Sequence, residues 1–260
     1  MQRNLRLADD ARVSLDDHGS GTPLLMLHGF PSTARLWDQV APRVAARGCR
    51  VIVPDLVGYG ASLAPAGARI DMASQARWMW QLLDALDIER VFLVAHDVGS
   101  AAAQLMVSAA PARARGLVIL DGVYGSEWAM DAIESIRAWA PADAARLFPV
   151  LARRLGRSAL MREMLAAYAG ADGGRRLIRA ARDLEPAQTA LIGASLQAST
   201  VPALVLWGRE DRYLDVETVG RPLADLLGAP LALLPGGHFT PIDCPSEVSD
   251  AVSDFVAARS

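Results

Sequence analysis

The turn at residues 95–100, Ala-His-Asp-Val-Gly-Ser, carries the side chain best placed for chemistry. Small residues two positions before and two positions after Asp97 allow a strand to reverse tightly into a helix. Such a turn puts the central side chain beside a helix N-terminus, where the helix dipole favours an ionised carboxylate. Asp97 is therefore a candidate nucleophile that needs no base to activate it. The alternative is a helix N-cap, which is a common role for aspartate.

Two later segments supply a candidate base and a candidate acid. His238 follows two glycines on a turn after the last predicted strand. Asp211 comes shortly after the preceding strand, where its carboxylate is suited to orient the imidazole. The order nucleophile, acid, histidine is the chain order of α/β-hydrolase triads. Taken singly, the histidine could be structural and the acid a solvated loop carboxylate or a helix cap.

A third segment, residues 28–31 (His-Gly-Phe-Pro), follows an earlier predicted strand. In such a loop the backbone N–H of Phe30 can pair with that of Val98 to stabilise an oxyanion. Glycine and proline also punctuate ordinary turns, so the loop alone does not decide the matter. The loop supports a catalytic site because it occurs together with the segments that carry Asp97, Asp211 and His238.

A mostly parallel sheet would bring these segments to one edge. Short apolar runs alternate with longer helical patterns, which is typical of a parallel sheet covered by helices. We expect an antiparallel edge strand at 11–15, further strands at 23–27, 50–53, 91–94, 116–120, 203–206 and 230–234, and helices at 71–86, 100–109, 216–227 and after 245. The strand signal disappears between 124 and 200. We therefore expect an α/β core at 1–123 and 201–260 and a helical lid at 124–200.

Composition excludes several classes of protein. The 260 residues carry 26 basic and 29 acidic side chains, so no global field favours nucleic acid. Every basic residue is an arginine, which excludes lysine-based Schiff-base chemistry and a P-loop lysine. Cys49 and Cys244 form neither a disulfide framework nor a metal-ligand spacing. With no visible signal peptide or membrane-length apolar run, we expect a cytoplasmic protein without metal, cofactor, nucleic-acid or membrane partner.

The chain resembles the α/β-hydrolase superfamily over nearly all its length. With Asp97 in the turn, it looks like the branch of epoxide hydrolases and haloalkane or haloacetate dehalogenases, and residues 28–31, 55–62 and 236–239 match that branch. The resemblance implies a mostly parallel sheet flanked by helices, with a helical lid inserted after the sixth strand. It also implies that Asp97 forms a covalent alkyl ester, which water activated by His238 cleaves. Asp211 would hold the histidine, with Asp121 as the second choice.

Departures from the family patterns favour epoxide opening to a diol. Haloalkane dehalogenases usually follow the nucleophile with tryptophan and often carry asparagine in the oxyanion loop, whereas Val98 and Phe30 offer no side-chain donor. Fluoroacetate dehalogenases place arginines after the nucleophile, where this chain has small apolar residues. Epoxide hydrolases need lid donors, usually tyrosines, and the insertion contains Tyr168, with Tyr124 at its margin. Core packing is the alternative role for Tyr168.

Other features leave alternatives open. Trp37, near the oxyanion loop, and Trp128 are candidate pocket residues or packing residues. Nine arginines between 146 and 182 either bind an anion or an acidic partner, or form a solvated face. The alternative functions are a haloalkane or haloacid dehalogenase, a cofactor-free lyase or cyclase using Asp97 and His238 as an acid–base pair, and a non-catalytic binding protein. We expect a small-molecule substrate, and the sequence leaves a homodimer open.

Overall fold

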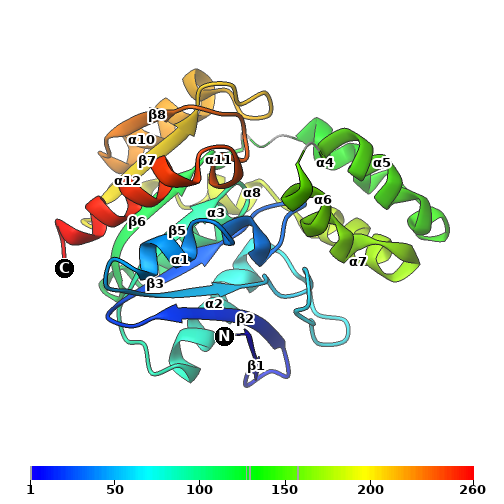
Figure 1. Cartoon of the computed structure of the whole chain (residues 1–260), viewed down its shortest axis with the longest axis horizontal. Helices are drawn as coiled ribbons and strands as arrows, with labels where there is room; N and C mark the ends of the chain where they lie inside the picture. The colour runs from blue at the N-terminus through cyan, green and yellow to red at the C-terminus, as the bar shows by residue number, and fades with distance from the viewer. Residues whose placement is uncertain (1, 127, 129, 157) are drawn as a thin grey trace.

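The structure, a computed structural model, describes residues 2–126, 128, 130–156 and 158–260. Within these residues one eight-stranded sheet has the order β1-β2-β4-β3-β5-β6-β7-β8 (Figure 1). Neighbouring strands are antiparallel at β1–β2 and β2–β4 and parallel elsewhere. The strands are β1 (Gln2–Arg6), β2 (Arg12–Gly19), β3 (Thr22–Leu27), β4 (Cys49–Pro54), β5 (Val91–His96), β6 (Ala114–Leu120), β7 (Ala203–Gly208) and β8 (Leu231–Leu234).

Helices cover both faces because the central strands are apolar on both sides. Leu25 and Leu27 face one buried cluster, whereas Leu24 and Met26, one position earlier, face the other. Helices α2 (Met72–Ala85), α3 (Gly99–Ala109) and α10 (Arg221–Leu227) contribute to the first cluster, and α1 (Ala41–Ala45) and α12 (Pro245–Ala257) contribute to the second.

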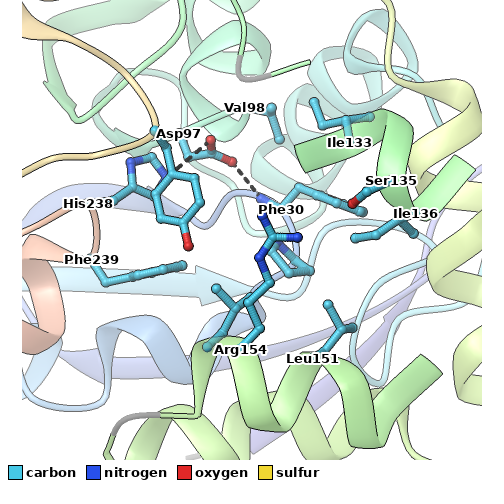
Figure 2. Close-up of a pocket in the computed structure, with 13 residues that line it drawn as sticks. Phe30, Asp97, Val98, Ile133, Ser135, Ile136, Leu151, Arg154, His238 and Phe239 are labelled. Atoms are coloured by element: carbon cyan, nitrogen blue, oxygen red, sulfur yellow. Dashed lines mark hydrogen bonds and ion pairs between the residues drawn. The ribbon is translucent and has the colours of Figure 1, made fainter. Parts of the chain in front are cut away.

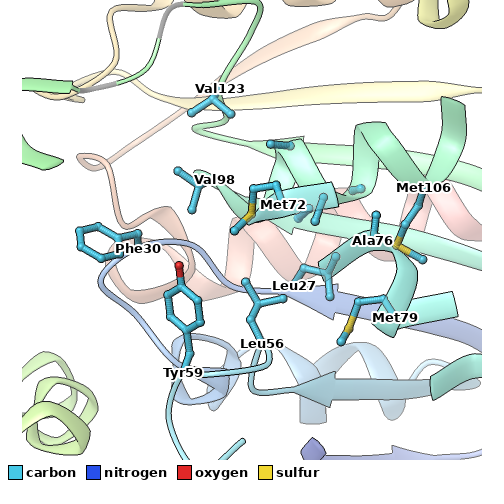
Figure 3. Close-up of a cluster of buried hydrophobic side chains, with 14 of the residues drawn as sticks. Leu27, Phe30, Leu56, Tyr59, Met72, Ala76, Met79, Val98, Met106 and Val123 are labelled. Carbon is cyan, nitrogen blue, oxygen red and sulfur yellow. The ribbon is translucent and has the colours of Figure 1, made fainter. Parts of the chain in front are cut away.

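The first cluster also supports the loops that were predicted to carry chemistry. Figure 3 shows it extending from Met79 and Met106 to Phe30 and Val98. These last two residues belong to the candidate oxyanion loop and to the turn after β5. Their side chains are buried, with 8% and 1% of their surfaces exposed. The backbone N–H groups of Phe30 and Val98 therefore belong to residues whose side chains are packed in the core.

The segment between β6 and β7 is mainly helical. Helices α4 to α7 lie together beside one end of the sheet (Figure 1). The helices of this segment are α4 (Met130–Arg137), η3 (Pro141–Arg146), α5 (Leu147–Leu155), α6 (Ala159–Leu165), η4 (Ala166–Tyr168), α7 (Gly170–Asp183), α8 (Ala187–Ala190) and α9 (Gly193–Gln197). The remaining short helices are η1 (Ala34–Trp37), η2 (Pro111–Arg113), the π-helix η5 (Val216–Gly220) and α11 (Thr240–Asp243).

The predicted mostly parallel sheet flanked by helices is confirmed, with one correction at the sheet edge. The strand predicted at 11–15 is β2, and it lies inside the edge because β1 pairs outside it. Leu5 is the one apolar residue in 2–6, so this segment suits an exposed edge strand but lacks the apolar pattern by which the other strands were predicted. No helix in the described ranges is long and apolar enough to span a bilayer.

Candidate active site

Asp97 lies at the tip of the turn that joins β5 to α3. Its φ angle of 52° falls in the left-handed region, which residues with a side chain rarely adopt. The Asp97 N–H donates to the carbonyl of Leu120 at 3.2 Å, and its own carbonyl accepts the N–H of Ser100 at 2.9 Å. A Cβ at Gly99 would lie 2.3 Å from the carbonyl oxygen of His28, so the turn requires glycine there. This strained, tightly packed turn holds the carboxylate at the carboxyl end of the sheet.

The Asp97 carboxylate is buried, and its two oxygens have different partners. Oδ1 accepts the backbone N–H of Phe30 at 2.7 Å, and Oδ2 lies 3.4 Å from Nε2 of His238. A Cβ at Gly29 would lie 2.2 Å from Oδ1, so only glycine lets this loop approach. Burial raises the pKa of Asp97, but the hydrogen bond and charge of His238 outweigh burial and hold the pKa below its usual value. Asp97 is therefore an ionised carboxylate.

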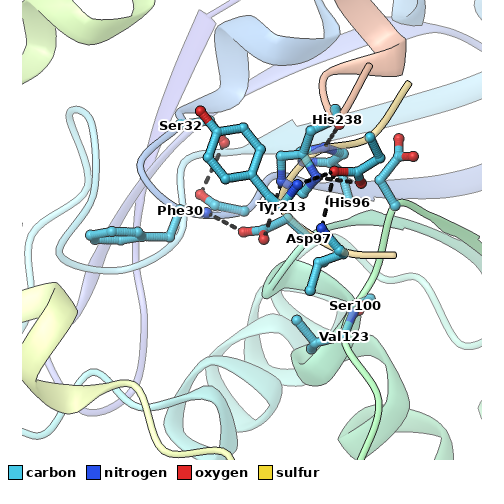
Figure 4. Close-up of polar contacts among 12 residues, drawn as sticks. Phe30, Ser32, His96, Asp97, Ser100, Val123, Tyr213 and His238 are labelled. Carbon is cyan, nitrogen blue, oxygen red and sulfur yellow. Dashed lines mark hydrogen bonds and ion pairs between the residues drawn. The ribbon is translucent and has the colours of Figure 1, made fainter. Parts of the chain in front are cut away.

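His238 connects Asp97 to Asp211. Its Nδ1 lies 2.8 Å from Oδ2 of Asp211, whose Oδ1 accepts the N–H groups of Tyr213 and Leu214 at 2.8 and 3.1 Å. The Asp211 and His238 side chains are only 1% and 5% exposed, so solvent screens their interaction little. Burial lowers the pKa of His238, but its bonds and charge interactions with Asp211 and Asp97 raise it well above its usual value. Figure 4 shows His238 beside Asp97.

Asp121, the second-choice acid, has other partners. Its Oδ1 accepts the N–H of Gly208 at 2.6 Å, and its Oδ2 accepts the hydroxyl of Thr240. Burial raises the pKa of Asp121 to about 8. In the structure, Asp211 rather than Asp121 therefore contacts the imidazole of His238. Asp121 instead connects the end of β6 to β7 and α11.

Two backbone N–H groups flank the nucleophile. That of Phe30 contacts Oδ1 of Asp97, and that of Val98, at the start of α3, has no acceptor within the described chain. These are the positions expected for an oxyanion hole, in which fixed donors stabilise a charge that develops during the reaction.

The two other buried histidines support the site without adding a base. Nε2 of His28 accepts the N–H of Leu56 at 2.9 Å, and Nε2 of His96 contacts the backbone oxygen of His238 at 2.7 Å. Burial lowers the pKa of each to about 4, so both are neutral at pH 7. His96 therefore helps to position the backbone that carries His238.

A pocket whose space of about 610 Å³ includes open solvent is lined in part by Asp97 and His238 (Figure 2). Loops at the strand ends supply one side, and α4 and α5 supply the other. Its lining is mainly apolar and comprises Phe30, Pro31, Asp97, Val98, Ile133, Ser135, Ile136, Leu151, Arg154, Leu155, Tyr213, His238 and Phe239.

Tyr168, the predicted lid donor, lies outside this lining. It is 1% exposed, and its hydroxyl donates to the backbone carbonyl of Ser32 at 2.8 Å. Burial raises the pKa of this hydroxyl well above its usual value, so it holds its proton. The expectation that Tyr168 faces substrate is therefore wrong in this structure. Its side chain connects η4 to the loop that follows β3.

The other predicted aromatic residues also lie outside the pocket lining. Trp37 is fully buried in the second hydrophobic cluster, and Nε1 of Trp128 donates to Thr189 at 3.0 Å. Tyr124 is partly buried against the core. Sequence position placed these rings near the loops, but the direction of a side chain depends on packing that position does not reveal.

Sequence reasoning missed Tyr213 and Arg154 as pocket residues. The Tyr213 ring lies 5.2 Å from the His238 ring, centroid to centroid. A usable signal existed for Tyr213, because it comes two residues after the acid Asp211. No such signal distinguished Arg154 from the other arginines of the lid.

The comparisons with known proteins agree with this fold. Residues 22–245 match the family described as alpha/beta hydrolase fold. A 2-hydroxymuconate semialdehyde hydrolase of a Pseudomonas species is 30% identical over 96% of this chain and 92% of the relative. A haloalkane dehalogenase of Mesorhizobium japonicum is 40% identical over 43% of this chain and 36% of the relative.

Solved structures show the same architecture. A haloalkane dehalogenase from Bradyrhizobium elkani superposes with a TM-score of 0.83 at 24% identity, covering 99% of this chain and 98% of the other. At that identity the likeness concerns the fold alone. Because the family match extends over most of the sequence and includes the segments that carry Asp97, Asp211 and His238, the chain belongs to the alpha/beta hydrolase fold family.

Proposed function

We propose that the protein hydrolyses a bond at a saturated carbon through a covalent ester on Asp97, and that its substrates are epoxides. The observation that carries this proposal is the pair of contacts on the carboxylate. Oδ1 is held by the N–H of Phe30, which leaves Oδ2 beside His238 in the floor of an apolar pocket. A carboxylate at the usual position of a serine can attack an alkyl carbon without a base.

In the first step, Oδ2 of Asp97 attacks one epoxide carbon, and the ring C–O bond breaks. The released alkoxide takes a proton from the hydroxyl of Tyr213, which solvent then restores. Tyr213 is 38% exposed and is the tyrosine of the described pocket lining. It takes the role that the sequence suggested for Tyr168.

In the second step, neutral His238 takes a proton from water, and the resulting hydroxide attacks Cγ of the Asp97 ester. Esterification removes the carboxylate charge that raises the pKa of His238, so the imidazolium releases its proton to solvent and can then act as a base. The N–H groups of Phe30 and Val98 stabilise the tetrahedral oxyanion, each contributing about 2.7–4 kcal/mol. Collapse expels the diol oxygen, which takes the proton from His238, and the proton left on the Asp97 carboxyl then passes to the neutral imidazole, which restores the carboxylate.

Halide displacement is the second candidate, favoured by the similarity to haloalkane dehalogenases. It uses the same two steps, except that the leaving halide needs no proton. The relative whose name describes a 2-hydroxymuconate semialdehyde hydrolase favours a third, non-covalent candidate. In that case Asp97 and His238 act as an acid–base pair on a carbon–carbon bond.

Intact-protein mass spectrometry of a His238→Gln variant separates these candidates. The variant is incubated separately with aryl and alkyl epoxides, haloalkanes and haloacetates. An adduct of epoxide mass that is absent from His238→Gln/Asp97→Asn supports the proposal. An alkyl adduct formed only from halides would replace it with dehalogenation, and no adduct from the whole panel would contradict covalent catalysis.

A further inference from the structure

Arg154 is distinguished from the other lid arginines by its position. Of the nine arginines between 146 and 182, position 157 lies outside the described residues. Six of the rest bond within the protein, to acidic side chains or backbone carbonyls: 146, 162, 175, 176, 179 and 182. Among the described arginines between 146 and 182, Arg153 and Arg154 alone have no such partner, and of these two Arg154 lines the pocket.

The guanidinium of Arg154 shares the pocket with the nucleophile. It extends from α5 into the pocket, on the side opposite the Asp97 turn (Figure 2). Apolar side chains, including Phe30, Ile136 and Leu151, line the space together with it. Arg154 is exposed and has no partner among the described residues, so its guanidinium is available to a ligand anion, which it can bind through two parallel N–H donors.

The charges of the site explain why an anion would need this arginine. Asp97 is ionised, and an anionic ligand entering the pocket would be repelled by it. A second pocket shares Arg154 and His238 with the first and is lined by Arg212 together with the acidic Glu210 and Asp243. Its mixed charges provide no uniform attraction for an anion. Arg154 is the arginine that lines both pockets.

We propose that Arg154 binds a carboxylate of the substrate, so that the enzyme acts on epoxides that bear a carboxylate separated from the reacting carbons by an apolar segment. This inference rests on the proposed function for the reacting end of the substrate. It assigns a role to Arg154 that differs from catalysis, because the guanidinium positions the substrate and takes part in no bond change.

Binding of an unreactive carboxylate tests the arginine independently of the chemistry at Asp97. Hexanoate and its neutral isostere hexanamide are titrated calorimetrically into the wild type, Arg154→Gln and the matched control Arg153→Gln. We expect Arg154→Gln to weaken hexanoate binding about ten- to one-hundred-fold more than hexanamide binding. Arg153→Gln should resemble the wild type. An equal loss for both ligands, or a wild type that does not bind hexanoate, would overturn the proposal.

The selectivity of the enzyme between two matched epoxides, one with and one without a carboxylate, tests the same role of Arg154 kinetically. The ratio of kcat/KM for 5,6-epoxyhexanoate to that for 1,2-epoxyhexane should fall about ten- to one-hundred-fold in Arg154→Gln. An unchanged ratio, with adducts still forming on His238→Gln, would refute the inference and leave the proposed function intact. Arginine-dependent hexanoate binding without any adduct would leave the anion site in place and refute the proposed function.

Discussion

Replacing Asp211 by asparagine tests the division of labour between the two hydrolytic steps. Asp211 accepts from Nδ1 of His238 at 2.8 Å, which leaves Nε2 free to accept a proton from water. Asparagine is nearly isosteric, and its oxygen can keep the N–H bonds from Tyr213 and Leu214. Its amide group then faces Nδ1 as a donor. The imidazole is therefore expected to carry its proton on Nε2, which is the wrong tautomer for a general base.

The expected loss is large and confined to the second step. The contact is short and both side chains are at most 5% exposed, so solvent cannot substitute for the missing charge. The same change in Ser-His-Asp triads lowers kcat by about 10⁴, and we expect a loss of roughly 10³ to 10⁴, or about 4–5 kcal/mol of barrier. Alkylation of Asp97 needs no base, so its rate should change far less.

Rapid-quench mass spectrometry of a single turnover measures both rates. Asp211→Asn should accumulate the ester on Asp97, whereas the matched control Asp121→Asn should turn over like the wild type. The asparagine of this control can accept from Gly208 and donate to Thr240, which preserves both contacts of Asp121. Accumulation of ester in Asp121→Asn alone, or an equal slowing of both steps in Asp211→Asn, would refute this assignment.

The remaining predictions concern Tyr213 and Asp121. Tyr213→Phe should slow alkylation of Asp97 by an epoxide about 10²-fold or more, as expected for loss of a general acid. Alkylation by a haloalkane should stay within a few-fold of the wild-type rate, with both rates measured by single-turnover kinetics. Equal effects on the two rates would exclude the donor role of Tyr213. The folded pKa of Asp121 is about 8, above its unfolded value, so the unfolded state binds fewer protons and stability falls as pH rises from about 4 to 8. Urea unfolding at pH 5 and 8 should show Asp121→Asn gaining at least about 1 kcal/mol relative to the wild type over that interval, and a constant difference would contradict the pKa.

Much of the fold and the site could be predicted because local sequence rules determine them. Asp97, His238 and Asp211 each follow a strand, and the carboxyl ends of parallel strands meet at one edge of the sheet. Small residues around Asp97 predicted the sharp turn, and the structure shows a positive φ angle at Asp97. Strand order and register then bring residues together that lie more than one hundred positions apart.

The pocket lining could not be predicted in the same way. Tyr168 and Arg154 both lie in helices between β6 and β7. The hydroxyl of Tyr168 is nevertheless buried against Ser32, whereas the guanidinium of Arg154 lines the pocket. The difference comes from how the lid helices pack on the core, which involves many weak contacts and no local motif. The choice between Asp121 and Asp211 depended on geometry as well, because both acids follow strands at the same sheet edge.

A single turnover in H₂¹⁸O tests the covalent ester most directly. Excess wild-type enzyme is mixed with the epoxide that alkylates His238→Gln, and the peptide containing Asp97 is analysed by mass spectrometry. Because water attacks Cγ of the ester, the account predicts ¹⁸O in the Asp97 carboxylate and unlabelled oxygens in the diol. Label in the diol with none in Asp97 would show direct attack of water on the substrate and would contradict the account.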